Sequence, residues 1–291
     1  MILSDLDGTL LGMDYSDRGV ARFASQLVRG GVEIVPCTSK TLCETQFYLR
    51  RWRLVTPAVV ESGGALWIPE RHPLSAIARA GARHSSRTWQ RRPDGWSASW
   101  GPAYARLEQA AARLAQHLPP EVALQYRWSV AELRAATGLS AAAARRALDR
   151  HHDLLIGLHP DRPRWRRLLA ARARRLGLRL TFGGRLLHLT GPHDKGHAAR
   201  RLLRLYRNAG GQPRTLALGD SPTDVSILRL ADRAVIIPRE PGGYDREVTT
   251  LVPWITKARK PAPEGWIEAV RDALAGAGMR AHGLRPLRSG C

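Results

Sequence analysis

Two carboxylates separated by one residue follow a short apolar run at the start of the chain, in the stretch 2–10, ILSDLDGTL. The apolar run predicts a buried strand, and Asp5 and Asp7 come where that strand ends, so both can turn toward one point. Gly8 permits the turn, and Thr9 can cap the next segment. Crowded acids repel each other unless a cation lies between them, and oxygen-rich sites suit Mg²⁺. The alternative is an ordinary turn with solvated acids.

A second pair of acids, Asp220 and Asp224, lies in the loop GDSPTD after the apolar run 215–218. A single loop carboxylate is usually solvated, whereas two that flank a turn after a buried strand indicate half of a metal site. Mg²⁺ takes one or two carboxylates together with waters and phosphate oxygens. The two acidic pairs together would supply such a set.

Hydroxyl and ammonium groups complete a candidate anion site. Thr38 follows the apolar run 32–37, where its hydroxyl would donate to a phosphate oxygen. Its alternative role as a helix N-cap is compatible, because helix N-termini attract anions. Ser39 and Lys40 lie in the same turn and would extend the site. Lys195 opens a later helix, where its ammonium group would neutralise nearby acids and a bound phosphate together, although a lone lysine there is commonly an ordinary helix-start residue.

The elements around these residues predict a parallel sheet. Helical spacing of apolar residues covers 17–29, between the opening strand and the strand 32–37. A strand, a helix and a strand within about 40 residues form a right-handed βαβ unit, whose strands end on the edge where open α/β sheets bind ligands. Asp5 and Thr38 are therefore expected to be neighbours. The same rhythm resumes after Lys195.

The middle of the chain lacks this rhythm. Residues 81–102 show weak periodicity, and the segment after them alternates helical patterns with short apolar runs. We therefore predict an α/β fold with a Rossmann-like parallel-sheet core of residues 1–79 and 187–291, and an inserted α+β domain of residues 80–186. Helices are expected at 104–118, 130–137, 141–150, 163–176, 197–206 and 225–230, and strands at 154–158, 178–182, 186–189 and 234–237.

The bulk composition limits the function classes. The 291 residues carry 46 Lys+Arg against 25 Asp+Glu, a net charge of +21, yet the basic residues are scattered and not interleaved with aromatic residues. We therefore predict a polyanionic small-molecule substrate and no nucleic-acid partner. No apolar run reaches the roughly 18–20 residues that span a bilayer. The acidic start is not typical of a signal peptide, and three cysteines without metal spacing indicate reduced thiols, so we expect a cytoplasmic protein.

The string DLDGTL at 5–10 resembles the first motif of the haloacid dehalogenase-like phosphatases, and Thr38, Lys195 and the acids of 220–224 occur in the order of the other three motifs. An insertion between the second and third motifs is similar to the α/β-capped branch of that superfamily, so the resemblance implies that residues 80–186 form a cap.

Further stretches resemble the mannosyl-3-phosphoglycerate phosphatase family over nearly the whole chain. They are TSKTxxE at 38–44, ExGGA at 61–65, TGLS at 137–140 and PEGW at 263–266. Ser62 is a departure, because family members usually carry Asn there. The resemblance implies Mg²⁺-dependent hydrolysis of mannosyl-3-phosphoglycerate to mannosylglycerate and phosphate, in compatible-solute synthesis. The glucosyl analogue remains open.

The resemblance also implies roles for the site residues. Asp5 would be the nucleophile and Asp7 the general acid/base, while Thr38 and Lys195 hold the transferring oxygens. Mg²⁺ would bind Asp5, the backbone carbonyl of Asp7 and Asp220, with Asp224 as a further ligand or an acceptor behind the site.

Recognition of the rest of the substrate is expected from glycines and from the hairpin that returns from the cap. Gly63 and Gly64 would let the backbone approach the ligand, or would simply form a turn. We hypothesise that Arg185 and His188 bind the glycerate carboxylate; the alternative is that both are surface residues.

Three rival functions stay open. One is a capped phosphatase of the same superfamily that acts on sucrose phosphate, a hexose phosphate or a phosphorylated cofactor, and the second is a phosphomutase. The third, from another class, is a basic nucleic-acid-binding protein on a relic phosphatase fold. The sequence does not indicate whether the protein is a monomer or an oligomer.

Overall fold

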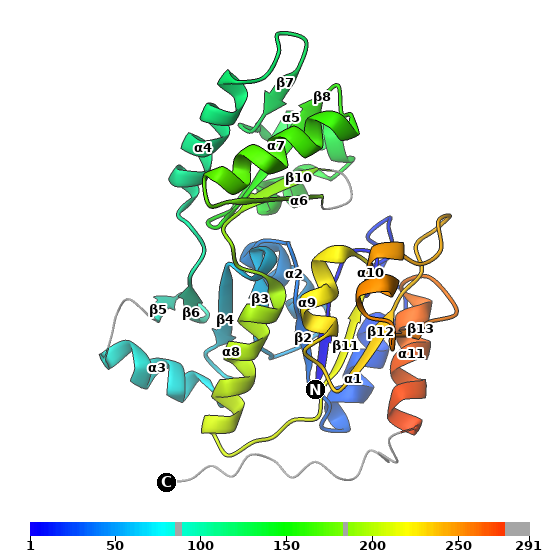
Figure 1. Ribbon diagram of the computed structural model, residues 1–291. Coiled ribbons are helices and arrows are strands. Elements are labelled where there is room, and N and C mark those ends of the chain that lie inside the picture. Colours follow the sequence, from blue (N-terminus) through cyan, green and yellow to red (C-terminus); the bar gives the residue numbers. More distant parts are fainter. Residues whose placement is uncertain (85–88, 183–185, 277–291) are drawn as a thin grey trace.

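The computed structural model describes residues 1–84, 89–182 and 186–276, and these form two lobes (Figure 1). Two connecting segments, one near Gly101 and one near Gly191, join the lobes. They lie against each other, since a Cβ atom on Gly191 would lie 2.6 Å from the Pro102 ring. The lower lobe contains both chain ends of the described fold, and the upper lobe is the inserted cap.

A five-stranded parallel sheet forms the centre of the lower lobe, in the order β13-β12-β11-β1-β2. The first strand lies inside this sheet, with Leu3 opposite Ala217 on one side and Val35 on the other. The βαβ logic of the sequence is therefore confirmed. The strands are β1 (Ile2–Ser4), β2 (Ile34–Pro36), β11 (Leu216–Gly219), β12 (Arg233–Ile236) and β13 (Thr256–Lys257).

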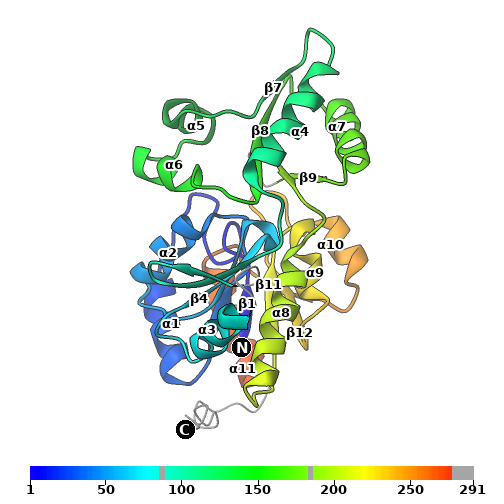
Figure 2. The same ribbon diagram turned by 90° about the vertical axis from the view of Figure 1, so that its left-hand side faces the viewer.

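Helices cover both faces of this sheet (Figures 1 and 2). One face packs against α1, α2 and α11, and the other against α8, α9 and α10, while α3 packs on the neighbouring antiparallel strands. In α1, Val20, Phe23 and Leu27 recur at helical spacing and are buried, each contributing about 1.5–3 kcal/mol. The helices are α1 (Val20–Arg29), α2 (Leu42–Arg51), α3 (Ser75–His84), α8 (Lys195–Asn208), α9 (Val225–Leu228), α10 (Arg246–Leu251) and α11 (Glu264–Ala275).

The last of these helices supports the first strand directly. Trp266 of α11 is fully buried, and its indole N–H donates to the Ser4 hydroxyl at 3.0 Å. Ser4 in turn donates to the backbone carbonyl of Asp5 at 2.7 Å. A residue near the end of the chain thereby fixes the backbone that presents the first acid.

An antiparallel sheet, β3-β4-β6-β5, extends the lower lobe, and a parallel bridge between Cys37 and Val59 joins it to β2. Strand β6 pairs with β4 over its whole length, so residues 90–99 lie with the core. The sequence prediction gave the cap residues 80–186; we propose instead that the cap begins after Trp100 and ends at Thr190. The elements are β3 (Ala58–Val60), the 3-10 helix η1 (Glu61–Gly63), β4 (Ala65–Pro69), β5 (Gln90–Arg92) and β6 (Gly95–Ser99).

The cap is a four-stranded antiparallel sheet in the order β7-β8-β10-β9 with helices on both faces (Figure 2). Helices α4 and α7 pack on one face, and α5 and α6 on the other. The predicted α/β core with an α+β insertion is therefore confirmed. The elements are α4 (Tyr104–Gln116), β7 (Ala123–Gln125), α5 (Val130–Thr137), α6 (Ala141–Ala147), β8 (Asp153–His159), α7 (Pro163–Arg175), β9 (Arg179–Phe182) and β10 (Leu187–Thr190).

Candidate functional site

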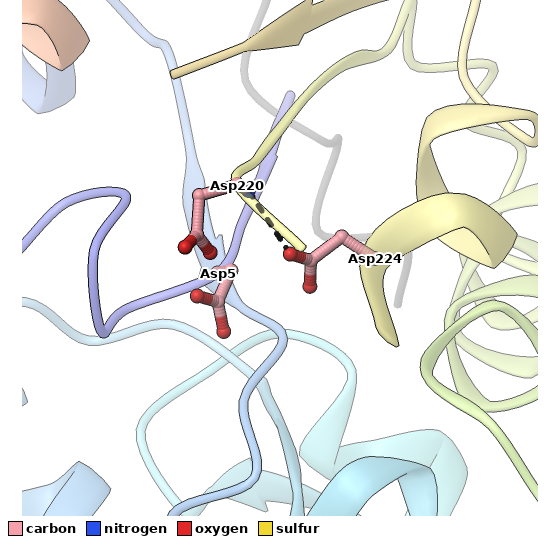
Figure 3. Close-up of side chains that lie close together, drawn as sticks. All are labelled: Asp5, Asp220 and Asp224. Carbon is pink, nitrogen blue, oxygen red and sulfur yellow. Dashed lines mark hydrogen bonds between the residues drawn. The ribbon is translucent and has the colours of Figure 1, made fainter. Parts of the chain in front are cut away.

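Three buried aspartates converge at the carboxyl edge of the parallel sheet (Figure 3). Asp5 follows β1, and Asp220 and Asp224 belong to the loop and the 3-10 helix η2 (Pro222–Asp224) after β11. One carboxylate oxygen of each lies within 4.8 Å of the others. Neighbouring parallel strands end at this edge, so residues more than 200 positions apart in the sequence meet here.

A buried lysine pairs with two of these acids. Lys195 Nζ lies 2.6 Å from Asp5 Oδ1 and 2.6 Å from Asp224 Oδ1. Lys195 begins α8, and η1 packs closely against that start. Gly63 makes this packing possible, because a Cβ atom there would collide with the backbone carbonyl of Asp194. Gly63 thus lets the start of α8 lie close enough for the Lys195 ammonium group to reach Asp5.

Asp224 holds its own loop in place. Its Oδ2 accepts hydrogen bonds from the backbone N–H groups of Asp220 at 3.1 Å and Ser221 at 3.0 Å, and from the Ser221 hydroxyl at 2.9 Å. Its Oδ1 accepts from Lys195. With both oxygens engaged, Asp224 suits the role of an acceptor that orders the loop and the lysine better than that of a primary metal ligand.

Asp220 has a cationic partner that the sequence argument missed. The Arg239 Nε group lies 2.5 Å from Asp220 Oδ2, and the Thr9 hydroxyl donates to Oδ1 at 3.3 Å. Gly8 has a φ of +76°, and a Cβ atom there would lie 2.7 Å from Asp220 Oδ2. Arg239 follows the strand β12, so the rule that parallel strands end at one edge would have identified it.

The acids carry more negative charge than their cations neutralise. Burial raises the pKa of Asp5 well above its usual range; Lys195 opposes this, and Asp224 and Asp220 add to it. Burial, with repulsion from Asp224, likewise raises the pKa of Asp220 to about 6 although Arg239 lowers it. A divalent cation with a preference for oxygen would relieve this repulsion, so the donor set fits Mg²⁺.

Asp7 lies on the tight loop after Asp5, and its side chain is 40% exposed. Its Oδ2 lies 2.9 Å from the ammonium nitrogen of Lys40, which also lies 3.4 Å from Glu44 Oε1. Burial lowers the pKa of Lys40, but Asp7 and Glu44 outweigh it and leave that pKa raised. The sequence prediction gave Lys40 a substrate contact, whereas in the structure its ammonium group faces two carboxylates of the protein.

The loop after β2 contains Thr38 and Ser39. Thr38 is fully buried, and its hydroxyl oxygen accepts a hydrogen bond from the Lys40 backbone N–H at 3.1 Å. The Ser39 carbonyl accepts from Arg150 of the cap at 3.2 Å. Thr38 follows β2, the neighbour of β1, so it lies at the same sheet edge as Asp5. The roles of both residues in binding substrate stay predictions.

The remaining predicted substrate contacts lie near the junction of core and cap. Gly64 packs against the cap side of this junction, since a Cβ atom there would lie 2.6 Å from His152 Cβ. His188 is buried, and its Nδ1 lies 2.9 Å from each carboxylate oxygen of Asp153. That bond leaves only Nε2 of His188 for a ligand. Arg185 lies outside the described residues.

A polar network not predicted from the sequence fastens the cap to η1. Glu61 Oε2 accepts the backbone N–H groups of His151 at 2.8 Å and His152 at 2.6 Å, and the Ser62 hydroxyl donates to Asp153 Oδ2 at 3.0 Å. Glu61 and Ser62 have φ values of +48° and +59°, which are strained for residues with side chains. The backbone N–H groups of both also bond to the loop of Lys40 and Thr38. The strained pair therefore connects the cap to the candidate anion loop.

Comparisons with known proteins agree with this geometry, although no family model matches the chain. Two curated relatives carry the name glucosyl-3-phosphoglycerate/mannosyl-3-phosphoglycerate phosphatase. The protein from Methanococcoides burtonii is 27% identical over 275 residues, 94% of this chain and 97% of its own length. The protein from Persephonella marina is 26% identical over 273 residues, 93% of this chain and 95% of its own length.

Solved structures give the same fold. The match to the HAD subclass IIB sugar phosphatase BT4131 covers 96% of this chain and 99% of that protein, with a TM-score of 0.62 and 11% identity. The comparisons confirm the capped haloacid dehalogenase-like fold and the resemblance to mannosyl-3-phosphoglycerate phosphatases, and they support a phosphatase. Within the described residues, no helix is long and apolar enough to cross a membrane.

Proposed function

We propose that this protein is a Mg²⁺-dependent phosphatase that hydrolyses mannosyl-3-phosphoglycerate, or its glucosyl analogue, through an aspartyl-phosphate on Asp5. The observation that carries the proposal is the buried Asp5 carboxylate 2.6 Å from Lys195, with two further acids beside it. The names of both curated relatives, which combine the glucosyl and mannosyl substrates, support the choice of substrate.

The proposed first step forms a bond from an Asp5 oxygen to phosphorus and breaks the bond from phosphorus to the glycerate oxygen. Asp7 gives its proton to that leaving oxygen. In the second step Asp7 takes a proton from water, which attacks phosphorus, and the Asp5–phosphorus bond breaks. Inorganic phosphate leaves, and the Asp5 carboxylate and the Asp7 proton are restored, so the cycle balances.

The cations prepare Asp5 for attack. A carboxylate is nucleophilic only when ionised, and burial among acids works against ionisation. Lys195 favours the charged form of Asp5, and the Thr38 hydroxyl would donate to a phosphoryl oxygen at the same edge. Asp5, Asp220 and the Asp7 backbone carbonyl would hold Mg²⁺, with Asp224 behind them. When bound, the ion would neutralise charge on the phosphoryl oxygens and on the acids.

The test is release of inorganic phosphate from mannosyl-3-phosphoglycerate, glucosyl-3-phosphoglycerate and plain hexose phosphates, each with Mg²⁺ or with EDTA. We expect turnover of at least one glycosyl-phosphoglycerate that is lost in EDTA. Preference for a hexose phosphate would favour the rival capped phosphatase, and binding to DNA without any turnover would favour the nucleic-acid alternative.

A pair of variants tests the nucleophile. Asp5→Asn should abolish turnover while the fold is kept, because the amide is a poor nucleophile of nearly the same shape. Asp272→Asn is the matched control, since Asp272 is exposed and pairs only with Arg259 in the described part of the chain. Retained turnover in Asp5→Asn would exclude the covalent mechanism.

A further inference from the structure

The two oxygens of Asp7 have different surroundings. Oδ2 faces the Lys40 ammonium group at 2.9 Å. Oδ1 is shielded from solvent and has no hydrogen-bond partner among the described residues. Buried carboxylate oxygens are nearly always paired, so an unpartnered one calls for a functional explanation. Because no described group holds Oδ1, the contact of Oδ2 with Lys40 sets the orientation of the Asp7 carboxylate.

Lys40 is fixed from several sides. Its ammonium group lies 3.4 Å from Glu44 Oε1 and 4.8 Å from the centre of the Tyr15 ring. Glu44 is held by the capping box at the start of α2, where its Oε2 accepts the Thr41 backbone N–H at 3.0 Å and its own N–H donates to the Thr41 hydroxyl. A rigid helix start therefore determines where the ammonium group lies.

We propose that Lys40 is a positioning residue for Asp7: its ammonium group holds Oδ2 and so fixes the orientation of the Asp7 carboxylate for proton transfer. This inference rests on the proposed function, in which Asp7 is the general acid/base. It differs from the predicted substrate contact of Lys40, because it needs no contact between Lys40 and the phosphorylated sugar. The chain of contacts runs from the capping box through Glu44 and Lys40 to Asp7.

A positioning role and a substrate contact of Lys40 predict different kinetics for its variants. Loss of a substrate contact raises KM, whereas a misplaced acid/base lowers kcat and leaves KM nearly unchanged. General acid/base catalysis contributes about 10²–10⁴-fold, so Lys40→Met should lower kcat by about 10–10²-fold, and by no more than Asp7→Asn does. Lys260→Met is the matched control, since Lys260 forms an exposed ion pair with Glu268. That control should leave kcat and KM unchanged.

A double-mutant cycle shows whether Lys40 acts through Asp7. Measured on the residual turnover of Asp7→Asn, the further change to Lys40→Met should have an effect of less than about 2-fold. Glu44→Gln provides a milder second variant in case Lys40→Met does not fold, and it should lower kcat by a few-fold at unchanged KM. This smaller effect should also vanish in the Asp7→Asn background.

Three outcomes would overturn the inference: a rise in KM at unchanged kcat, effects of Lys40→Met and Asp7→Asn that multiply, or wild-type kinetics in both Lys40→Met and Glu44→Gln. Each of these leaves wild-type phosphatase turnover intact. Absence of turnover in the wild-type enzyme would instead contradict the proposed function, so the two failures are distinguishable.

Discussion

Asp220→Asn should stabilise the metal-free protein while it removes activity. Burial and the neighbouring Asp224 raise the pKa of Asp220 from its ordinary value of 3.8 to about 6, and this value already includes the attraction of Arg239. One pKa unit corresponds to about 1.4 kcal/mol, so ionised Asp220 costs the fold about 3 kcal/mol. Asparagine keeps an oxygen acceptor for Arg239 and removes the like charge. We expect the free energy of unfolding to rise by about 1–3 kcal/mol.

The direction of the pKa shift of Asp220 determines how the stability gain of Asp220→Asn changes with pH. The pKa of Asp220 is higher in the folded protein than in the unfolded chain. The energetic cost of ionised Asp220 is therefore fully present above about pH 6 and disappears as the pH falls from there toward 3.8. The gain from Asp220→Asn should therefore be largest near neutral pH and shrink on acidification. Mg²⁺ should stabilise the wild-type protein, because it binds the folded state, and should stabilise the variant much less.

The assay is urea unfolding followed by tryptophan fluorescence, in EDTA at about pH 7.5 and about pH 4.5, with a parallel thermal scan in Mg²⁺. Asp272→Asn, at an exposed ion pair, is the control and should stay within about 0.5 kcal/mol of the wild type. A variant less stable than the wild type in EDTA at neutral pH would refute the reasoning. So would a gain that does not shrink on acidification.

Two further substitutions test the buried charges and the strained junction. Lys195→Met should lower the free energy of unfolding in EDTA by about 3–5 kcal/mol, because it leaves Asp5 and Asp224 buried without their cation. A loss below about 1 kcal/mol in urea unfolding would contradict this. Ser62→Asn should stabilise the fold by about 0.5–1 kcal/mol, since Asn tolerates the left-handed conformation and its amide can still donate to Asp153. A lower Tm in calorimetry would show that the hydrogen bond of the serine hydroxyl outweighs the relief of backbone strain.

The position of the main acids could be predicted because it follows from topology. Apolar runs identified the strands, and the right-handed βαβ rule brought the residues after them to one edge. Asp5, Asp220, Asp224 and Lys195 needed no knowledge of side-chain packing to be brought together. Their order along the chain also carried the resemblance that the comparisons confirm.

Residues fixed by tertiary contacts were harder to predict. Lys40 and Glu44 are four positions apart, so their pairing was accessible from helix geometry, but the bond of Lys40 to Asp7 depends on how the loop after β1 folds. Strands β5 and β6 were missed because the segment around Trp96 lacks clear alternation, and its pairing partner β4 lies on the other side of α3 in the sequence. Arg239 was missed because its loop carries no recognisable motif, although its position after β12 could have been derived from the same strand-edge rule.

The insertion of the cap affects how the chain can fold during synthesis. Strand β1 needs β11 as its second neighbour, yet Leu216, which pairs with Ile2, emerges from the ribosome more than 200 residues later. Until then one edge of this fully buried strand is unpaired, and unpaired apolar edges promote association between chains. The cap is continuous in sequence and can fold first on the nascent chain. We therefore expect that chains truncated before Leu216 aggregate, with a folded cap attached to an incomplete core.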